Sequence, residues 1–168
     1  MDEKQVEFSH IDAAGRAVMV DVGAKPETGR RAVAECRVML AEATYSLLAS
    51  KALPKGDVLA VARVAGILAA KRTGELIPLC HPLFLTCVDV DFFPDPTRHV
   101  IRIQAEARTN GPTGVEMEAL VAAQIAALTI YDMCKAVQRD IRITDCRLLH
   151  KSGGRSGTWN ADENLPGR

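Results

Sequence analysis

Aromatic residues are scarce in this chain: they make up 4% of its 168 residues, whereas 48% of the residues are hydrophobic. The hydrophobic content is therefore mostly aliphatic, and small aliphatic side chains suit close packing of helices on a sheet. A net charge is also lacking, because 21 basic residues balance 21 acidic ones. Without a broad field of one sign we expect no binding to nucleic acid or to a membrane surface, although a local cluster of cations can still bind a small anion.

Several familiar motifs are missing as well. The chain contains no CxxC pair, and its five cysteines lie in apolar or strand-like runs (Cys36, Cys80, Cys87, Cys134 and Cys146). This usage is typical of reduced core thiols in a cytosolic protein, and no ligand spacing for zinc is present. The GxxxxGK[ST] and GxGxxG motifs are absent, which disfavours ATP or dinucleotide binding by those routes.

Targeting segments are not apparent either. The N-terminal MDEKQVEFSH begins acidic and lacks the apolar region of a signal peptide. Polar residues interrupt the longest apolar runs before they reach the length that spans a bilayer. We therefore expect a soluble, cytoplasmic protein that folds as one domain over residues 1–168, with a Gly- and Ser-rich mobile tail over residues 151–168.

The hydrophobic pattern predicts an α+β architecture. Strand-like runs fall at residues 16–22, 31–40, 83–93, 99–108 and 140–149. Helical patterns fall at residues 42–49, 58–72 and 114–136, and Asp57 is suited to cap the second helix. In that helix we expect Val58, Val61, Ala65 and Leu68 to face the core. The order of elements favours a sandwich in which helices cover one face of an antiparallel sheet.

The helix predicted over residues 114–136 is apolar almost all the way round, yet it ends with Asp132 and Lys135. A helix this apolar is expected to be buried, where an unpartnered carboxylate is costly. An acid and a base three residues apart form either a structural ion pair or a catalytic pair, and spacing alone leaves both readings open. Glu118 lies fourteen residues before Asp132, about 21 Å along the helix axis. One compact ligand therefore cannot contact both from one chain.

If both are site residues, either the ligand is elongated or these helices pair between two subunits. Small residues would permit close approach of two helices (Ala119, Ala122, Ala123, Ala126 and Ala127). Each site would then draw on two subunits.

Three turns carry further candidates. His81 lies in a turn stiffened by prolines, and is either a packing residue or a ligand-binding imidazole. Lys55 precedes a helix N-terminus, which is either an ordinary capped turn or an anion site. The segment KSGGRSG from Lys151, and the pair formed by Arg30 and Arg31, are either solvated surface or phosphate-binding groups.

Four segments together resemble the cyclic pyranopterin monophosphate synthase family, the MoaC family (molybdenum cofactor biosynthesis protein C). They are HIDAAGRAVMVDVGAKPETGRRA, KGDVLAVARVAGILAAKRTGELIPLCHPL, GVEMEALVAAQIAALTIYDMCKAVQRD and LLHKSGGRSG. The resemblance covers residues 10–157 and implies a ferredoxin-like fold and a homohexamer, a trimer of dimers. It also implies conversion of 3′,8-cyclo-7,8-dihydroguanosine triphosphate to cyclic pyranopterin monophosphate with release of pyrophosphate, at a site between subunits.

The resemblance also implies residue roles. The family's catalytic residues fall on Asp132, Lys135 and Lys55. Its substrate contacts fall on a further set (Leu79, Cys80, His81, Met117, Glu118, Arg30 and Lys151, with Arg155 in the same loop). Val18 stands where the family often has a histidine. We hypothesise that lysines of lowered pKa beside a carboxylate move protons while the purine ring is opened and rebuilt.

Two other functions compete with this one. A metal-dependent hydrolase would use His81 and Asp132 together, and a non-catalytic ferredoxin-like module would bind a small molecule without needing both lysines beside it. No resident metal or organic cofactor is expected. Whether Mg²⁺ assists the departure of pyrophosphate, and which lysine acts as acid, does not follow from the sequence.

Overall fold

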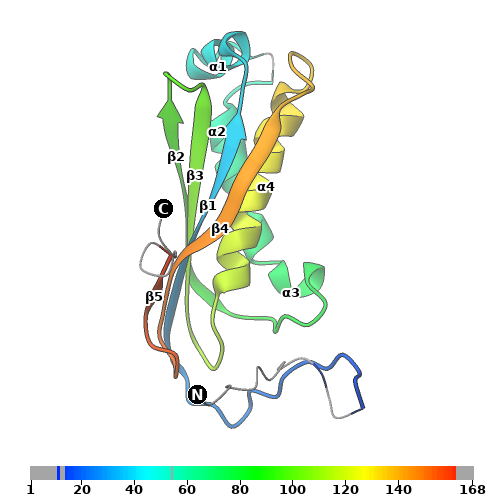
Figure 1. Cartoon of the computed structure of the whole chain (residues 1–168), viewed down its shortest axis with the longest axis vertical. Coiled ribbons are helices and arrows are strands. Elements are labelled where there is room, and N and C mark those ends of the chain that lie inside the picture. Colours follow the sequence, from blue (N-terminus) through cyan, green and yellow to red (C-terminus); the bar gives the residue numbers. More distant parts are fainter. Residues whose placement is uncertain (1–10, 12–13, 54, 162–168) are drawn as a thin grey trace, which may run out of the picture.

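A single antiparallel sheet of five strands, in the order β2-β3-β1-β4-β5, forms one layer of the molecule. The computed structural model describes residues 11, 14–53 and 55–161. The strands are β1 (Thr28–Met39), β2 (Leu85–Asp95), β3 (Val100–Gly111), β4 (Arg142–Ser152) and β5 (Trp159–Asn160). The helices are α1 (Glu42–Ala49), α2 (Val58–Ala70), α3 (Thr73–Leu76) and α4 (Glu116–Cys134). Figure 1 shows α4 running along the length of the sheet.

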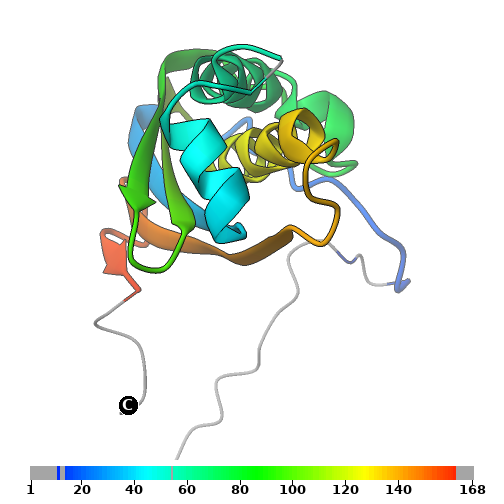
Figure 2. The ribbon, with the colours of Figure 1, turned by 90° about the horizontal axis from the view of Figure 1, so that it is seen from above.

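The chain order and the strand order together give a ferredoxin-like α+β fold, which confirms the predicted fold class. Strand β1 pairs with β3 on one side and with β4 on the other, and β2 pairs with β3. Seen from above, the helices lie on one face of the sheet (Figure 2). Helix α1 has the predicted bounds, and the side chain of Asp57 accepts a hydrogen bond from the backbone N–H of Ala60 at the start of α2, as predicted.

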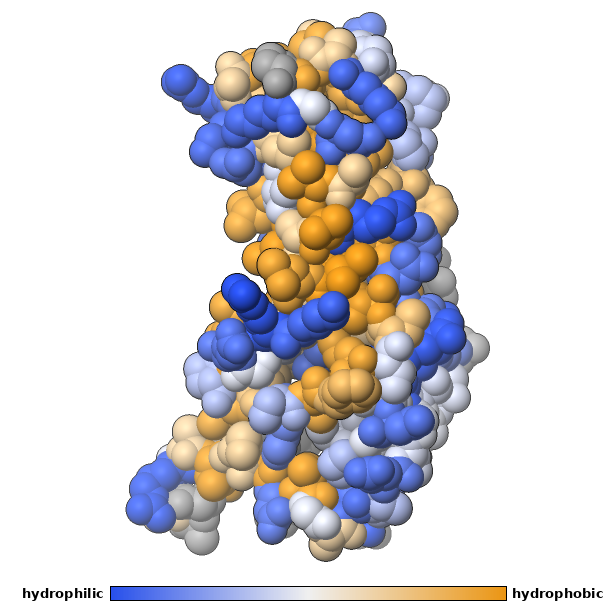
Figure 3. Space-filling model, turned by 180° about the vertical axis from the view of Figure 1, so that it is seen from behind, coloured by the Kyte–Doolittle hydropathy of each residue, from blue (hydrophilic) through white to orange (hydrophobic). Residues whose placement is uncertain are grey.

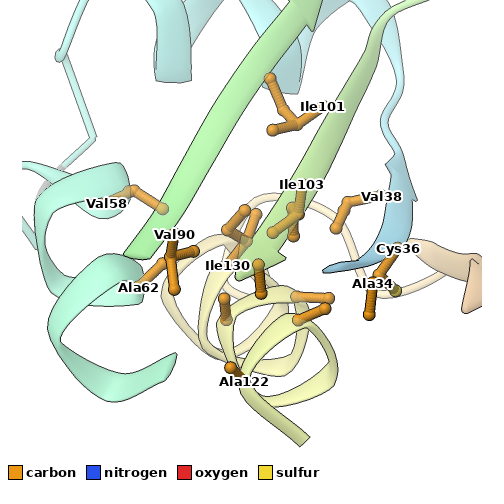
Figure 4. Packing of buried hydrophobic residues seen from close by; sticks show 14 of the residues in the cluster. Ala34, Cys36, Val38, Val58, Ala62, Val90, Ile101, Ile103, Ala122 and Ile130 are labelled. Carbon is orange, nitrogen blue, oxygen red and sulfur yellow. The ribbon is translucent and has the colours of Figure 1, made fainter. Parts of the chain in front are cut away.

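The core lies between this helical layer and the sheet. Val90, Ile101, Ile103 and Ile130 are among its fully buried side chains, and Figure 4 shows them converging from β2, β3 and α4. Helix α4 is long and apolar enough to pass a test for membrane-spanning segments, but half of its most apolar window is buried inside the chain. This burial is typical of a helix in the core of a folded domain.

The alanine surface of α4 serves packing within one chain, which corrects the expectation that it pairs with a second subunit. All five alanines are fully buried in the single chain (Ala119, Ala122, Ala123, Ala126 and Ala127). Helix α2 crosses them at Gly66, where an added Cβ would lie 2.9 Å from the carbonyl oxygen of Ala122. The small side chains let α4 approach both β1 and α2 closely.

Two other sequence predictions are wrong. Residues 16–22 form no strand, and only an isolated bridge joins Ile11 to Ala17. The core face of α2 consists of Val58 and its small residues, whereas Val61 and Leu68 are each 47% exposed. Gly and Ala let α2 and α4 approach each other closely, so the larger aliphatic side chains of α2 point outward. Apolar surface is visible on the face of the molecule shown in Figure 3.

The glycine-rich segment after residue 150 contributes to the sheet. Lys151 and Ser152 end β4, and β5 pairs with β4 through His150–Asn160 and Lys151–Trp159. The mobility expected from residue 151 onward stays a prediction, and residues 162–168 lie outside the described part of the chain.

Candidate functional site

The sequence-predicted site residues gather at the two ends of α4. At its C-terminal end lie three of them, which we call the lysine–aspartate cluster: Lys55, Asp132 and Lys135. The ammonium group of Lys135 donates to Asp132 Oδ1 at 2.7 Å. Lys55 Nζ donates to the backbone carbonyl of Asp132 at 2.9 Å and to Oδ2 at 3.3 Å. Lys55 can reach the end of α4 because α2, which follows it, packs along α4.

The charges of this cluster stabilise one another in the ionised state. Hydrogen bonds from Lys135, and then from Lys55, lower the pKa of Asp132 below its usual value. The hydrogen bond to Asp132 in turn raises the pKa of Lys135. The hypothesis that this lysine has a lowered pKa is therefore wrong for the single chain, because the hydrogen bond and the charge of Asp132 outweigh the desolvation of a side chain that is 52% exposed.

At the N-terminal end of α4, five predicted substrate contacts line one cavity of about 190 Å³. They are Leu79, Cys80, His81, Met117 and Glu118. The segment from Leu79 to His81 approaches α4 because α3 turns the chain back after α2. Nε2 of His81 donates to the carbonyl oxygen of Val20 at 2.8 Å, which ties the segment containing Val18 to the cavity wall.

Glu118 is the most electrostatically unusual residue of this cavity. It is 4% exposed, and burial raises its pKa to about 7, with the negative charge of Glu116 adding to the effect. The pKa of Cys80 is also raised, mainly by burial and to a smaller extent by the negative charge of Glu118. A carboxyl group with a pKa near neutrality can both accept and donate a proton.

A second cavity, of about 570 Å³, adjoins the first. Cations from three segments line it (Lys25, Arg30, Arg31, Lys151 and Arg155). Both cavities are lined by Thr113, Gly114 and Glu116, so they lie side by side, and we call the two together the binding groove. Its cations are suited to a polyanionic ligand.

Local backbone geometry holds the cationic part of the binding groove in place. Arg30 donates from Nε to the carbonyl oxygen of Gly111 and from Nη2 to that of Pro112, both at 3.2 Å. Gly153 and Gly154 have φ of 96° and 74°, and a Cβ at either position would collide with the backbone of Gly29 or the guanidinium of Arg30. Glycine is therefore required where the loop closes over Arg30.

The structure thus brings together seven of the ten predicted site residues in the binding groove and the other three in the lysine–aspartate cluster. No residue of that cluster lines either cavity. Sequence reasoning missed Lys25, a lone cation before a proline, and the pairing of Glu116 with Lys151 at 2.9 Å. Within residues 11, 14–53 and 55–161, no three His, Cys, Asp or Glu side chains are arranged to hold a metal ion.

Comparison with known proteins gives a consistent result. The model of the MoaC family matches residues 19–154. A cyclic pyranopterin monophosphate synthase of Oleidesulfovibrio alaskensis is 62% identical over 154 residues, which cover 92% of this chain and 97% of the relative. The enzyme of the same name from Chloroflexus aggregans is 60% identical over 157 residues, covering 94% and 95%. That from Rhodospirillum rubrum is 58% identical over 154 residues, covering 92% and 93%.

Proposed function

This chain belongs to the MoaC family, and we propose that it acts as a cyclic pyranopterin monophosphate synthase, a lyase of molybdenum cofactor biosynthesis. The observation that carries the proposal is the binding groove, which joins a five-cation cavity to a smaller one containing His81 and Glu118. Such a groove fits a nucleotide-derived substrate with a triphosphate at one end and a ring system at the other. We take that substrate to be 3′,8-cyclo-7,8-dihydroguanosine triphosphate.

The cationic part of the groove would bind the triphosphate and stabilise the departing pyrophosphate. Arg30 presents a guanidinium fixed by two backbone carbonyl groups, so little side-chain entropy is lost on binding. Lys151 is held by Glu116 in the ligand-free chain, and a phosphate oxygen would compete for the same ammonium group. Charge that develops on the leaving group would meet donors that are already in position.

The smaller part of the groove would hold the ring system. Opening and rebuilding a purine requires protons to move on and off nitrogen and carbon. Glu118 is buried there with a pKa of about 7, so near neutral pH it can carry a proton in either direction. His81 and the backbone of Leu79 and Cys80 would position the ring against it.

We further propose that the lysine–aspartate cluster of a neighbouring subunit completes each groove. Along α4 the cluster lies about 21 Å from Glu118, too far for one compact substrate. Large apolar side chains are exposed on and beside the helices, among them Val64 at 65%, Leu128 at 51% and Phe84 at 87%. Exposed apolar surface of this kind (Figure 3) favours contact between copies, in the homohexamer that the family resemblance implies.

Such an assembly would also change the pKa values of the two lysines. Covering Lys55 and Lys135 with a neighbouring groove removes water and brings them close to other cations, and both effects lower a lysine pKa. In the single chain Lys135 is held charged by Asp132. Assembly would therefore convert a surface ion pair into a pair of proton carriers.

The competing functions have less support. His81 and Asp132 belong to separate groups at opposite ends of α4, so they form no metal site within the described part of one chain. We propose that the enzyme has no resident metal, that any Mg²⁺ acts only on the phosphates, and that the protein acts in the cytoplasm. Full activity of a metal-free preparation would exclude the hydrolase. A binding module without catalysis would not require Lys55 and Lys135 at the ligand.

Mixing of inactive variants tests the shared site. Lys135→Ala lacks the cluster and Arg30→Ala lacks the groove, so each alone should release little pyrophosphate. Coexpressed in equal amounts, they should recover roughly a quarter of wild-type sites, because half of the grooves and half of the clusters are intact and they combine at random. The matched control mixes Lys135→Ala with Lys55→Ala, which damage the same cluster and should recover nothing.

The outcomes separate the two parts of the proposal. No recovery in the first mixture, with an active wild-type enzyme, would show that each site lies within one chain. If the wild-type protein forms neither cyclic pyranopterin monophosphate nor pyrophosphate from the substrate, the proposed activity itself is wrong.

A further inference from the structure

Two thiols meet across β1 and β4, away from the binding groove and the lysine–aspartate cluster. Glu35 pairs with Arg147 and Arg37 pairs with Thr144, so Cys36 alone faces both Asp145 and Cys146. This is a β-bulge, and Asp145 has a φ of 53° within it. The regular pairs on either side of the bulge place Cys36 and Cys146 side by side on neighbouring strands, and disulfides join residues whose Cα atoms are about 4.4–6.8 Å apart.

The side chains of these two cysteines lie on the same face of the sheet. Cys36 is fully buried and points into the core with Ala34 and Val38 (Figure 4). Leu148, which packs against the core, is two residues from Cys146, and residues two apart on a strand share a face. The interaction with the Cys36 side chain is the largest influence on the pKa of Cys146, which it lowers to about 7, while Cys146 raises the pKa of Cys36.

The two thiols differ in access to solvent. Cys146 is exposed, whereas Cys36 has no exposed surface. Cys36 Sγ also lies 3.7 Å from Gln124 Oε1 and 3.6 Å from the carbonyl oxygen of Thr144. An exposed thiol with substantial thiolate character reacts with oxidants, and a shielded neighbour is placed to resolve the product.

We propose that Cys36 and Cys146 form a reversible cross-strand disulfide when the protein meets hydrogen peroxide. The Cys146 thiolate attacks one peroxide oxygen, an S–O bond forms as the O–O bond breaks, and hydroxide leaves, giving a sulfenic acid. The Cys36 sulfur then attacks the Cys146 sulfur, the S–S bond forms as the S–O bond breaks, and the hydroxyl group departs with the Cys36 proton as water. Both sulfurs are oxidised, and both peroxide oxygens end as water.

Trypsin makes this disulfide easy to identify. Cleavage after Arg31 and Arg37 releases AVAECR, residues 32–37, and cleavage after Arg142 and Arg147 releases ITDCR, residues 143–147. The full-length protein is treated with hydrogen peroxide in its native state, its free thiols are alkylated after denaturation so that the buried Cys36 is accessible, and it is digested without reduction. The expected product is one species with the mass of both peptides less two hydrogen atoms, and dithiothreitol should return both alkylatable thiols.

Two variants control the experiment. Cys146→Ser changes an exposed side chain, so it should fold, lose the linked species and leave Cys36 alkylatable. Cys87→Ser removes another exposed thiol, on β2, which is separated from β1 by β3, and should leave the linked species at the wild-type yield. Linkage of either peptide to a different cysteine, overoxidised Cys146 with free Cys36, or two thiols that stay alkylatable after peroxide would each overturn the proposal.

Discussion

Replacement of Gly66 by alanine tests the packing that places Lys55 beside Asp132. Gly66 lies where α2 crosses α4, and an added Cβ would be 2.9 Å from the carbonyl oxygen of Ala122. It would also lie 3.2 Å from Val90 Cγ2 and 3.3 Å from Ala126 Cβ. Because the nearest atom belongs to the backbone of a core helix, relief requires α2 and α4 to move apart by a few tenths of an ångström.

The magnitude follows from two opposing effects. Overpacking of a tight core costs about 1–3 kcal/mol, whereas Gly→Ala inside a helix gains about 1 kcal/mol of intrinsic propensity. The variant should therefore lose about 1 kcal/mol of stability, or about 2–4 °C in melting temperature for a domain of this size. Displacement of α2 should also separate Lys55 from the end of α4, and turnover should fall by more than the stability loss explains.

The assay is urea unfolding at a fixed protein concentration, with Ala60→Gly as the control. Ala60 lies on the exposed side of the same helix, so this change loses about 1 kcal/mol through propensity alone. Alanine should thus be preferred at position 60 and glycine at position 66. If Gly66→Ala proves as stable as the wild type or more so, the two helices are not packed as tightly as described and the reasoning fails.

Two further substitutions test the electrostatics of the site. Lys135→Ala should lower turnover about 10²–10⁴-fold by removing a proton carrier, with little change in the urea midpoint. The control is Lys51→Ala, which breaks another 2.7 Å ion pair, with Asp57, and should leave turnover unchanged. Wild-type-like turnover of Lys135→Ala would show that Lys135 is not a catalytic residue. Glu118→Gln should be neutral at about pH 4 and stabilising by up to about 3 kcal/mol at about pH 8. The sign follows because folded Glu118 keeps its proton up to a pKa of about 7, whereas the unfolded chain releases it near 4.5, so wild-type stability falls as pH rises through that window. An effect equal at both pH values would show that the assembled protein supplies Glu118 with a charge partner.

Local signals in the sequence were sufficient for most of the fold. The alternation in β2 and β3, the cap at Asp57 and the apolar run of α4 each specify one element without help from distant residues. Residues 16–22 show strand alternation but lie against no strand of the sheet, which no local pattern reveals. The buried face of α2 was misassigned because hydrophobicity favours Val and Leu, whereas close approach to α4 selects Gly66 and its neighbouring alanines.

The candidate site was less predictable from local sequence patterns than the fold. Residue types and spacing alone left His81, Lys55 and the KSGGRSG loop undecided between structure and function, and only the family motifs identified them as site residues. The position of His81 and of the KSGGRSG loop in one groove depends on segments that are far apart in the sequence, whereas Lys55 lies outside that groove. The direction of the Lys135 pKa shift was not predictable, because it depends on whether the hydrogen bond to Asp132 or desolvation at the end of α4 has the larger effect.

The solvent exposure of the lysine–aspartate cluster suggests a connection between catalysis and assembly. In the single chain the lysine–aspartate cluster is charged and more than half exposed at Asp132 and Lys135, a state that resists proton transfer near neutral pH. Glu118, at the other end of the same rigid helix, is buried and already poised between its two protonation states. A helix cannot shorten, and we propose that a second copy brings its cluster to the groove. In the proposed assembly the contact that completes the site also removes the water that keeps the lysines protonated, and an unassembled chain would bind the substrate without converting it.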